Sequence, residues 1–307
     1  MELFEIEIIE KINHDNMEKM ISILNKMPKL KHLKIIGGIS PKELSNFNNI
    51  KNIEYLNIGI DLYYEKVEIF PINLNNYFIN YENLNTLIIE SMDSFKISND
   101  KNSSFSFIFP PKLKFINLIN FDDTIIIPLL EKNKKNLKNV EEIKLENCHF
   151  IHEKFSIMVD LFSCFKNLIK LSLNKIDFKS SYKSIMEDII LYDYVPSLLK
   201  SVPSLIELDI SNNQYNDKIL KSNIFKEIKK SIPKKLFSLN IFNREISVTS
   251  KAFDYLTKVF GSLLYFDINY PIIDDTLKIS NENHNDVDLP FYENYNSDYS
   301  DYEIDGN

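Results

Sequence analysis

The sequence predicts an α/β solenoid, in which stacked strand–helix units contribute their strands to one shared parallel sheet. Three observations predict this fold. One short aliphatic pattern recurs ten times between residues 3 and 268. Between its copies, the spacing of apolar residues changes to a period near 3.6, which is typical of helices. Proline repeatedly stands just before the next copy, where it ends a helical segment because it disfavours helix at the residue before it.

Each copy consists of an aliphatic residue, two variable residues, an aliphatic residue, one variable residue and a last aliphatic residue. Alternation of this kind is typical of a strand with one buried face. The copies start about 29 residues apart on average, at intervals of 23 to 37, so the repeat is irregular. They are Leu3/Ile6/Ile8, Leu30/Leu33/Ile35, Ile53/Leu56/Ile58, Leu84/Leu87/Ile89, Leu113/Ile116/Leu118, Val140/Ile143/Leu145, Leu168/Leu171/Leu173, Leu205/Leu208/Ile210, Leu236/Leu239/Ile241 and Leu263/Phe266/Ile268.

Four segments between the copies carry an apolar helical face, and Asp15 is the expected N-cap of the first. Each unit has one apolar face that it cannot bury alone, so neighbouring units must stack. The helical faces are Met17/Ile21/Leu24, Phe155/Met158/Val159/Phe162/Phe165, Leu220/Ile224/Ile228 and Phe253/Leu256/Val259/Phe260, and the prolines that precede strands are Pro28, Pro111, Pro203 and Pro233.

Two copies extend the pattern into a turn. Residues 140–150 read VEEIKLENCHF and residues 205–215 read LIELDISNNQY. Cys148 and Asn213 occupy the same position in these two copies, where a side chain can bond the backbone of the bend. From about Leu3 to Ile268 the chain resembles the leucine-rich repeats of the ribonuclease-inhibitor-like class. The resemblance implies a horseshoe with a concave parallel sheet and helices on its convex side.

Three segments depart from this pattern. Residues 63–83 and 91–110 lack a clean helical face, and we expect extended or short 3₁₀ segments there. The unit from Leu168 to Leu205 is long and contains Pro196, so we expect two short helices.

Charge divides the chain into a repeat domain, 1–280, and an acidic tail, 281–307. The tail holds eight acidic residues and no Lys or Arg, which accounts for the whole formal charge of −8. We interpret it as a disordered solubilising extension that is dispensable for folding. The alternative is a docking or phosphorylation segment that uses its tyrosines, Tyr292, Tyr295, Tyr299 and Tyr302.

The composition bounds the compartment and the class of partner. Two cysteines are too few for a disulfide framework. No apolar run approaches the roughly 20 residues that span a bilayer, and no signal peptide is recognised. Arg244 is the only arginine, although guanidinium groups are preferred for phosphate binding. We therefore expect a cytoplasmic monomer without cofactor, nucleic-acid partner or membrane partner, with secretion into a host cell as the alternative compartment.

Two clusters invite a sharper interpretation. Cys148, His149 and His152 suggest a thiol–imidazole or metal site, but no second Cys/His pair supplies further ligands. We interpret Cys148 as a buried structural residue beside loop histidines. Two lysine groups could contact nucleic acid, yet they lie late in helical segments, before the next strand, where they complement the helix dipole and favour solubility. These groups are Lys132/Lys134/Lys135/Lys138 and Lys229/Lys230/Lys234/Lys235.

The variable residues of each strand are the remaining candidates, because they face away from the core. Solenoids bind partners on such extended surfaces. We therefore expect a protein-binding scaffold or adaptor without catalysis. The alternatives are a secreted effector, a substrate-recognition subunit of a ubiquitin ligase, or an enzyme with a site near Cys148 and His149. The predicted partner-binding residues are Tyr55, Asn57, Ile88, Phe115, Asn117, Glu142 and Lys144.

Overall fold

A computed structural model gives the fold. It describes residues 5–8, 14–44, 46–47, 51–60, 78, 81–92, 107–179, 191–213, 224–240, 248–249, 258, 265–267 and 272–273. Internal contacts divide the chain into two units, Met1–Ile273 and Asp274–Asn307. The acidic tail, 281–307, and the helical face that begins at Phe253 lie outside the described residues, so both stay predictions.

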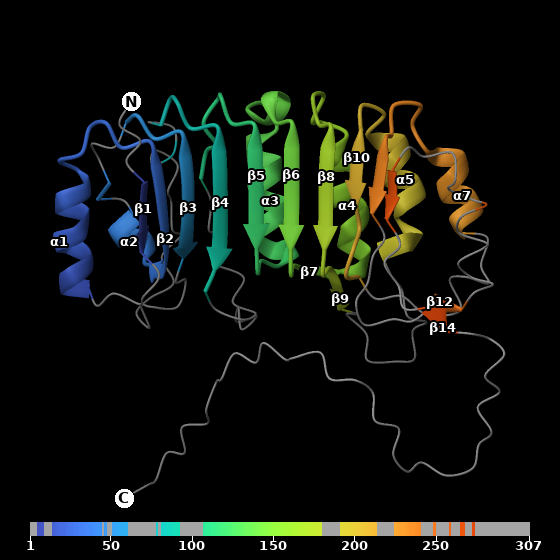
Figure 1. Cartoon of the computed structure of the whole chain (residues 1–307), viewed down its shortest axis with the longest axis horizontal. Coiled ribbons are helices and arrows are strands. Elements are labelled where there is room, and N and C mark those ends of the chain that lie inside the picture. Colours follow the sequence, from blue (N-terminus) through green and yellow to red (C-terminus); the bar gives the residue numbers. More distant parts are fainter. Residues whose placement is uncertain are drawn as a thin grey trace, which may run out of the picture. The chain divides into compact units, whose positions relative to one another are not determined.

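One ten-stranded parallel sheet runs through the first unit, with its strands side by side in chain order (Figure 1). Every copy of the aliphatic pattern forms one of these strands, as predicted. They are β1 (Glu5–Ile8), β2 (His32–Ile39), β3 (Tyr55–Ile60), β4 (Thr86–Ser91), β5 (Phe115–Ile119), β6 (Glu142–Glu146), β8 (Lys170–Asn174), β10 (Glu207–Asp209), β11 (Ser238–Asn240) and β13 (Tyr265–Asp267).

The strands share one register. The middle aliphatic residue of each copy pairs with its counterparts on both neighbouring strands, from Ile6 through to Phe266. In β2 to β11 these residues are no more than 2% exposed. Because side chains alternate along a strand, this register places the variable residues together on the opposite face.

Helices cover the other face of the sheet, and α3, α4 and α5 lie behind the strands in Figure 1. Each buries an apolar stripe, and Phe155, Met158 and Phe162 of α4 are 0% exposed. The helical elements are α1 (His14–Leu24), α2 (Pro41–Leu44), α3 (Asp123–Asn133), the 3₁₀ turn η2 (Leu137–Asn139), α4 (His152–Phe162), the 3₁₀ turn η3 (Leu191–Asp193), α5 (Val195–Ser201) and α7 (Ile224–Ser231).

Several helical expectations need correction. Because α1 begins at His14, Asp15 lies inside the helix and is not its N-cap. Pro196 does not separate two helices but lies at the start of α5, after the 3₁₀ turn η3, and because residues 180–190 lie outside the described residues, a second α-helix in this unit stays a prediction. Proline suits the start of a helix because the first helical turn leaves its N–H groups unbonded anyway. The helix α3 has no single apolar face in the sequence and contains Pro128, so periodicity did not predict it.

Most of the two segments expected to be extended or 3₁₀, 63–83 and 91–110, lies outside the described residues, and 107–110 has no regular secondary structure. Phe107 and Phe109 are nonetheless 0% exposed. Asn133 holds them in place: its Oδ1 accepts from the Phe109 N–H at 2.7 Å, and its Nδ2 donates to the Phe107 carbonyl at 2.8 Å. Asn133, from the following helix α3, therefore provides the hydrogen-bond partners that these backbone groups would otherwise find in a helix or sheet.

The bend after the strand is built from the side chain that the sequence singled out. Nδ2 of Asn213 donates to the Leu173 carbonyl at 2.6 Å and to the Ile210 carbonyl at 2.7 Å, and its Oδ1 accepts from Ile176 N–H at 2.7 Å. Cys148 Sγ donates in the same way to the carbonyl of Leu118, on the preceding strand, at 3.4 Å. Each of these two side chains thus ties two repeats together. Just before this position, four residues adopt positive φ, namely Asn120, Asn147, Lys175 and Asn212.

Two further pairs of short strands lie outside the main sheet and were not predicted. One pair is β7 (His149–Ile151) with β9 (Asp177–Lys179), and the other is β12 (Val248–Thr249) with β14 (Ile272–Ile273). With two or three residues each, these strands are too short for an alternating pattern to be recognised in the sequence.

Candidate binding face

Two rows of side chains cross the face of the sheet that the helices leave uncovered. They contain all the predicted site residues. Among their described side chains, all are partly exposed except Asn117 and Ser172, which are 6% and 8% exposed. The first row is Glu5, His32, Tyr55, Thr86, Phe115, Glu142, Lys170, Glu207, Ser238 and Tyr265, and the second is Glu7, Lys34, Asn57, Ile88, Asn117, Lys144, Ser172, Asp209, Asn240 and Asp267.

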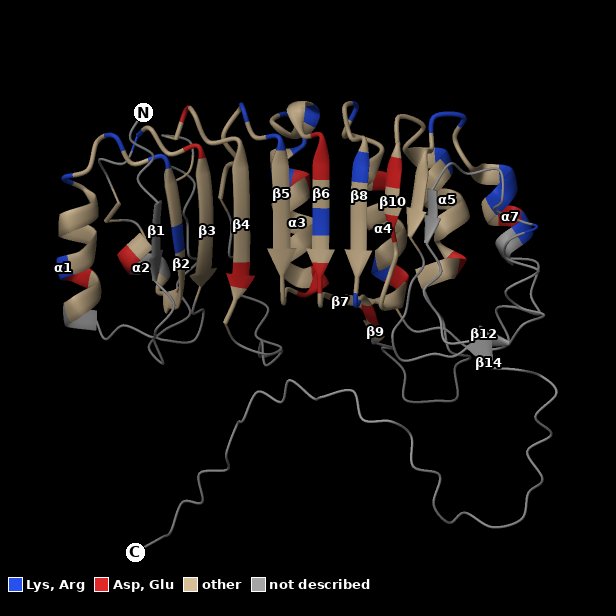
Figure 2. Cartoon of the chain, viewed as in Figure 1, with Lys and Arg blue, Asp and Glu red and all other residues tan. Residues whose placement is uncertain are grey.

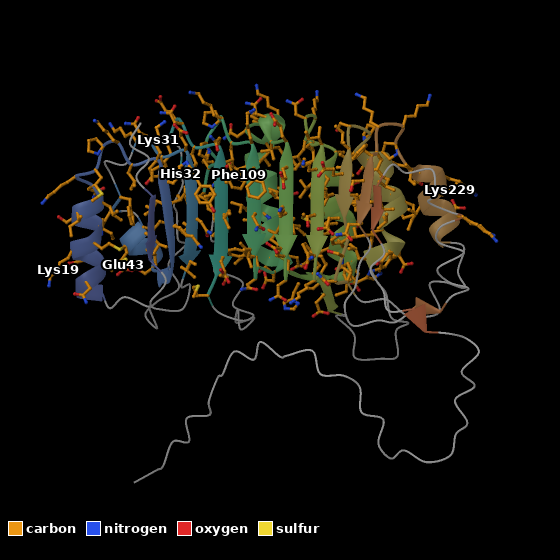
Figure 3. All side chains as sticks on the ribbon, viewed as in Figure 1. Lys19, Lys31, His32, Glu43, Phe109 and Lys229 are labelled. Carbon is orange, nitrogen blue, oxygen red and sulfur yellow. The ribbon has the colours of Figure 1, made fainter. Side chains whose placement is uncertain are left out.

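The N-terminal half of this face carries its large aromatic and aliphatic side chains, beside polar residues such as Lys34 and Asn57. The His32 and Tyr55 rings stack, with centroids 5.6 Å apart, and Figure 3 labels His32 at this end of the sheet. Thr86 lies between Tyr55 and Phe115 in the first row, and Ile88 follows two residues later on the same strand. The three large side chains therefore lie on adjacent strands, about 5 Å apart, and form one apolar patch. They are partly exposed, not protruding.

The C-terminal half of the face is charged, and its charges pair with each other. Lys170 Nζ lies 2.9 Å from Glu207 Oε1, and Ser172 Oγ donates to Asp209 Oδ2 at 3.1 Å. Glu207 raises the pKa of Lys170 through their hydrogen bond. These groups already have partners, so they offer an incoming protein less new interaction than the apolar half does.

Lys144 lies at the boundary between the two halves. Its Nζ is 3.6 Å from Glu142 Oε1 and 5.6 Å from the centroid of the Phe115 ring. The ammonium group therefore spans the charged and the aromatic part of the face. Contacts of this kind orient a side chain more than they stabilise it when both partners remain solvated.

Asn117 differs from the other predicted site residues because its side chain is buried. Its Nδ2 donates to Glu146 Oε2 at 2.7 Å, while its Oδ1 has no hydrogen-bond partner among the described residues. Glu90 accepts from Asn120 Nδ2 at 3.3 Å. Burial, and to a lesser degree the Glu146 carboxylate, raises the pKa of Glu90. Asn117 therefore supports the acidic margin of the face and offers little surface of its own, and its part in partner binding stays a prediction.

The three residues of the thiol–imidazole cluster contact different partners in the described structure. Cys148 is 0% exposed, and burial raises its pKa to about 12, so the thiolate is scarcely populated at neutral pH. His149 Nδ1 lies 2.9 Å from Asp177 Oδ2, and His152 contacts the Tyr194 hydroxyl, which also donates to the His152 carbonyl at 2.9 Å. Within the described part of the chain, no group of three or more His, Cys, Asp or Glu is placed to hold a metal ion.

Some members of the lysine groups lie in last helical turns, as expected, whereas Lys234 and Lys235 lie beyond the end of α7. Lys132 is in the last turn of α3, Lys138 is in η2, and Lys229 and Lys230 are in the last turn of α7. They belong to the edge of the sheet at which the strands begin, and Figure 2 shows blue segments along this edge. No helix among the described residues is long and apolar enough to cross a membrane.

Comparison with known proteins adds structural likeness at low identity. No protein-family model and no curated protein matches the sequence. An internalin from Listeria monocytogenes aligns with 83% of this chain at 15% identity and a TM-score of 0.40, and a Bacteroides fragilis protein aligns with 84% at 17% identity and a TM-score of 0.49. The aligned part is 66% of the first protein and 62% of the second, so the chain spans just under two thirds of each. The strand order, the common register and the turn position shared by Cys148 and Asn213 identify the fold of this chain as a leucine-rich-repeat solenoid.

Proposed function

We propose that the chain is a binding scaffold that holds a protein partner on the uncovered face of its sheet. The observation that carries this proposal is the contrast between the two halves of that face. The apolar patch of Tyr55, Ile88 and Phe115 is partly exposed, whereas the charges beside it are paired with each other. Binding energy in protein interfaces concentrates in a few such aromatic and aliphatic anchors.

Glu142 and Lys144 border the patch and are suited to orienting the partner, since charges at the rim of an interface affect specificity more than affinity. Asn57 lies between Lys34 and Ile88 in the second row and extends the polar margin. The buried Cys148 thiol supports a function without catalysis at this place in the fold. Helices between the strands support the ribonuclease-inhibitor-like class, and the free cysteines Cys148 and Cys164 support a reducing, cytosol-like compartment.

The test places a photo-crosslinking amino acid at Thr86, between Tyr55 and Phe115. We expect it to trap a discrete partner in cells. The same amino acid at Ile157, which is 40% exposed on α4, is the matched control and should not trap that partner.

Substitution then tests the patch itself. Tyr55→Ser, Ile88→Ser and Phe115→Ser together should abolish capture, whereas Lys170→Ser with Glu207→Ser, on the charged half of the same face, should preserve it. A triple variant that keeps the native circular dichroism and melting temperature, yet captures the partner as before, would show that binding takes place elsewhere.

A further inference from the structure

One row of residues follows the edge of the sheet at which the strands begin. Each member immediately precedes a strand, and its carbonyl accepts the N–H groups of the next member and of the residue after it. Ile169, for example, accepts from Ile206 and Glu207, and Ile206 accepts from Phe237 and Ser238. Members next to each other in the row are therefore one strand spacing apart, about 5 Å. The row is Lys31, Glu54, Asn85, Lys114, Glu141, Ile169, Ile206 and Phe237.

The character of this row changes along its length. Its first part forms ion pairs between neighbouring repeats, Lys31 with Glu54 at 2.6 Å and Lys114 with Glu141 at 2.9 Å. Figure 3 labels Lys31 at this edge. Its last three described members are apolar and accessible: Ile169 and Ile206 are partly exposed, and Phe237 is 47% exposed. Single exposed apolar residues are common, whereas here one exposed and two partly exposed apolar residues follow one another along one edge.

Lysines flank these three apolar residues, while the acidic residues Glu207 and Glu227 lie next to the same segments and pair with Lys170 and Lys230. Segments 163–169, 200–206 and 229–237 contain six lysines and no Asp or Glu. All six lysine side chains are exposed. The helix dipole explains lysines in a last helical turn, such as Lys230. It does not explain Lys166, Lys234 and Lys235, which lie beyond the ends of α4 and α7.

The two edges of the sheet differ in their content of lysines and acidic residues. Including segments 25–31, 51–54, 81–85, 110–114 and 131–141, the edge at which the strands begin holds sixteen lysines and four glutamates. At the opposite edge, the described segments 90–92, 119–123, 146–154, 174–179 and 209–213 hold seven acidic residues and three lysines, Lys154, Lys175 and Lys179. Figure 2 shows more blue than red along the first edge, and red at the ends of β4 and β6 on the second.

We propose that the basic–apolar edge, formed by Lys166, Lys200, Lys234 and Lys235 around Ile169, Ile206 and Phe237, docks the chain on an anionic lipid surface. Lysines attract such a surface over about a Debye length, and exposed Phe and Ile side chains enter the boundary between headgroups and acyl chains. A nucleic acid would use the lysines but not the apolar row, because phosphate contacts need only the charges. The lipid surface therefore accounts for both features.

This proposal revises the expectation that no membrane takes part, which rested on the absence of a spanning segment. It is independent of the binding face, because the edge row and the two rows of the sheet face are different surfaces.

The test is co-sedimentation of the full chain with vesicles of mixed phosphatidylserine and phosphatidylcholine, compared with vesicles of phosphatidylcholine alone. We expect binding to the anionic vesicles only, and weaker binding as salt shortens the Debye length to about 8 Å at physiological ionic strength. Lys234→Glu with Lys235→Glu should weaken this binding about tenfold or more. Phe237→Ser should weaken it while leaving its salt dependence unchanged.

Two control variants match these substitutions. Ile157→Ser removes a comparably exposed apolar residue from α4, and Lys175→Glu reverses a charge at the opposite edge, so neither should change binding. No sedimentation with anionic vesicles at low salt would overturn the proposal. A second result would also overturn it: the Phe237→Ser variant binds the anionic vesicles as well as the parent does, and heparin displaces the protein from them. That result would indicate a surface for soluble polyanions.

Discussion

Replacing Asn213 with alanine tests whether one side chain joins two repeats. The side chain is 1% exposed, and its removal leaves the Ile176 N–H and the Leu173 and Ile210 carbonyls without these bonds. Each buried group left unsatisfied costs about 1–3 kcal/mol, and carbonyls lie toward the low end because they retain a second lone pair. We therefore expect Asn213→Ala to lower the free energy of unfolding by about 3–5 kcal/mol.

The measurement is urea unfolding followed by far-ultraviolet circular dichroism, since the chain has no tryptophan. Asn213→Cys should recover part of the loss, because Cys148 occupies the equivalent position and donates to the equivalent carbonyl. Asn212→Gly is the neighbouring control: its φ of 55° is one that glycine adopts freely, so stability should change little. If Asn213→Ala unfolds within about 0.5 kcal/mol of the parent, the bonds of Asn213 do not hold the repeats together.

Three further predictions follow from burial and charge. Leu145 in β6 is 0% exposed, so Leu145→Asp should lower the free energy of unfolding in urea by several kcal/mol. Lys144→Ser, on the opposite face of the same strand, should lower it by about 1 kcal/mol or less. Equal unfolding midpoints for the two variants would contradict the register. Cys148, with its pKa raised to about 12, should resist alkylation by iodoacetamide until the protein unfolds, and mass spectrometry would reveal early modification. Because the pKa of Glu90 is raised in the fold, ionising it opposes stability as pH rises through that pKa. Glu90→Gln should therefore raise the melting temperature at neutral pH but not well below Glu90's ordinary pKa of 4.5, and a gain that persists in acid would contradict this cause.

Features that extend along a single strand or turn could be predicted. The aliphatic pattern located all ten strands, because a strand with one buried face requires alternation regardless of its neighbours. The turn role of Cys148 and Asn213 was recognised for the same reason, since the position follows its strand at a fixed distance. Short elements were missed. The helix α2 was missed because it has only four residues. A signal for its start was present in the sequence, since Ser40 and Glu43 form a capping box in which Glu43 Oε2 accepts from Ser40 N–H at 2.9 Å.

Side-chain contacts between repeats could not be predicted, because intervals of 23 to 37 residues separate the partners. The aliphatic pattern also does not specify which neighbouring repeat a given side chain contacts. The sequence by itself determined which residues face away from the core, because side chains alternate along each strand. From this alternation Tyr55, Ile88 and Phe115 were proposed as a binding patch. Only the tertiary structure decided that Asn117 is buried and that Lys170 is paired with Glu207. It also brought Ile169, Ile206 and Phe237 into one row, because stacking converts a position that is irregular in sequence into one that is regular in space.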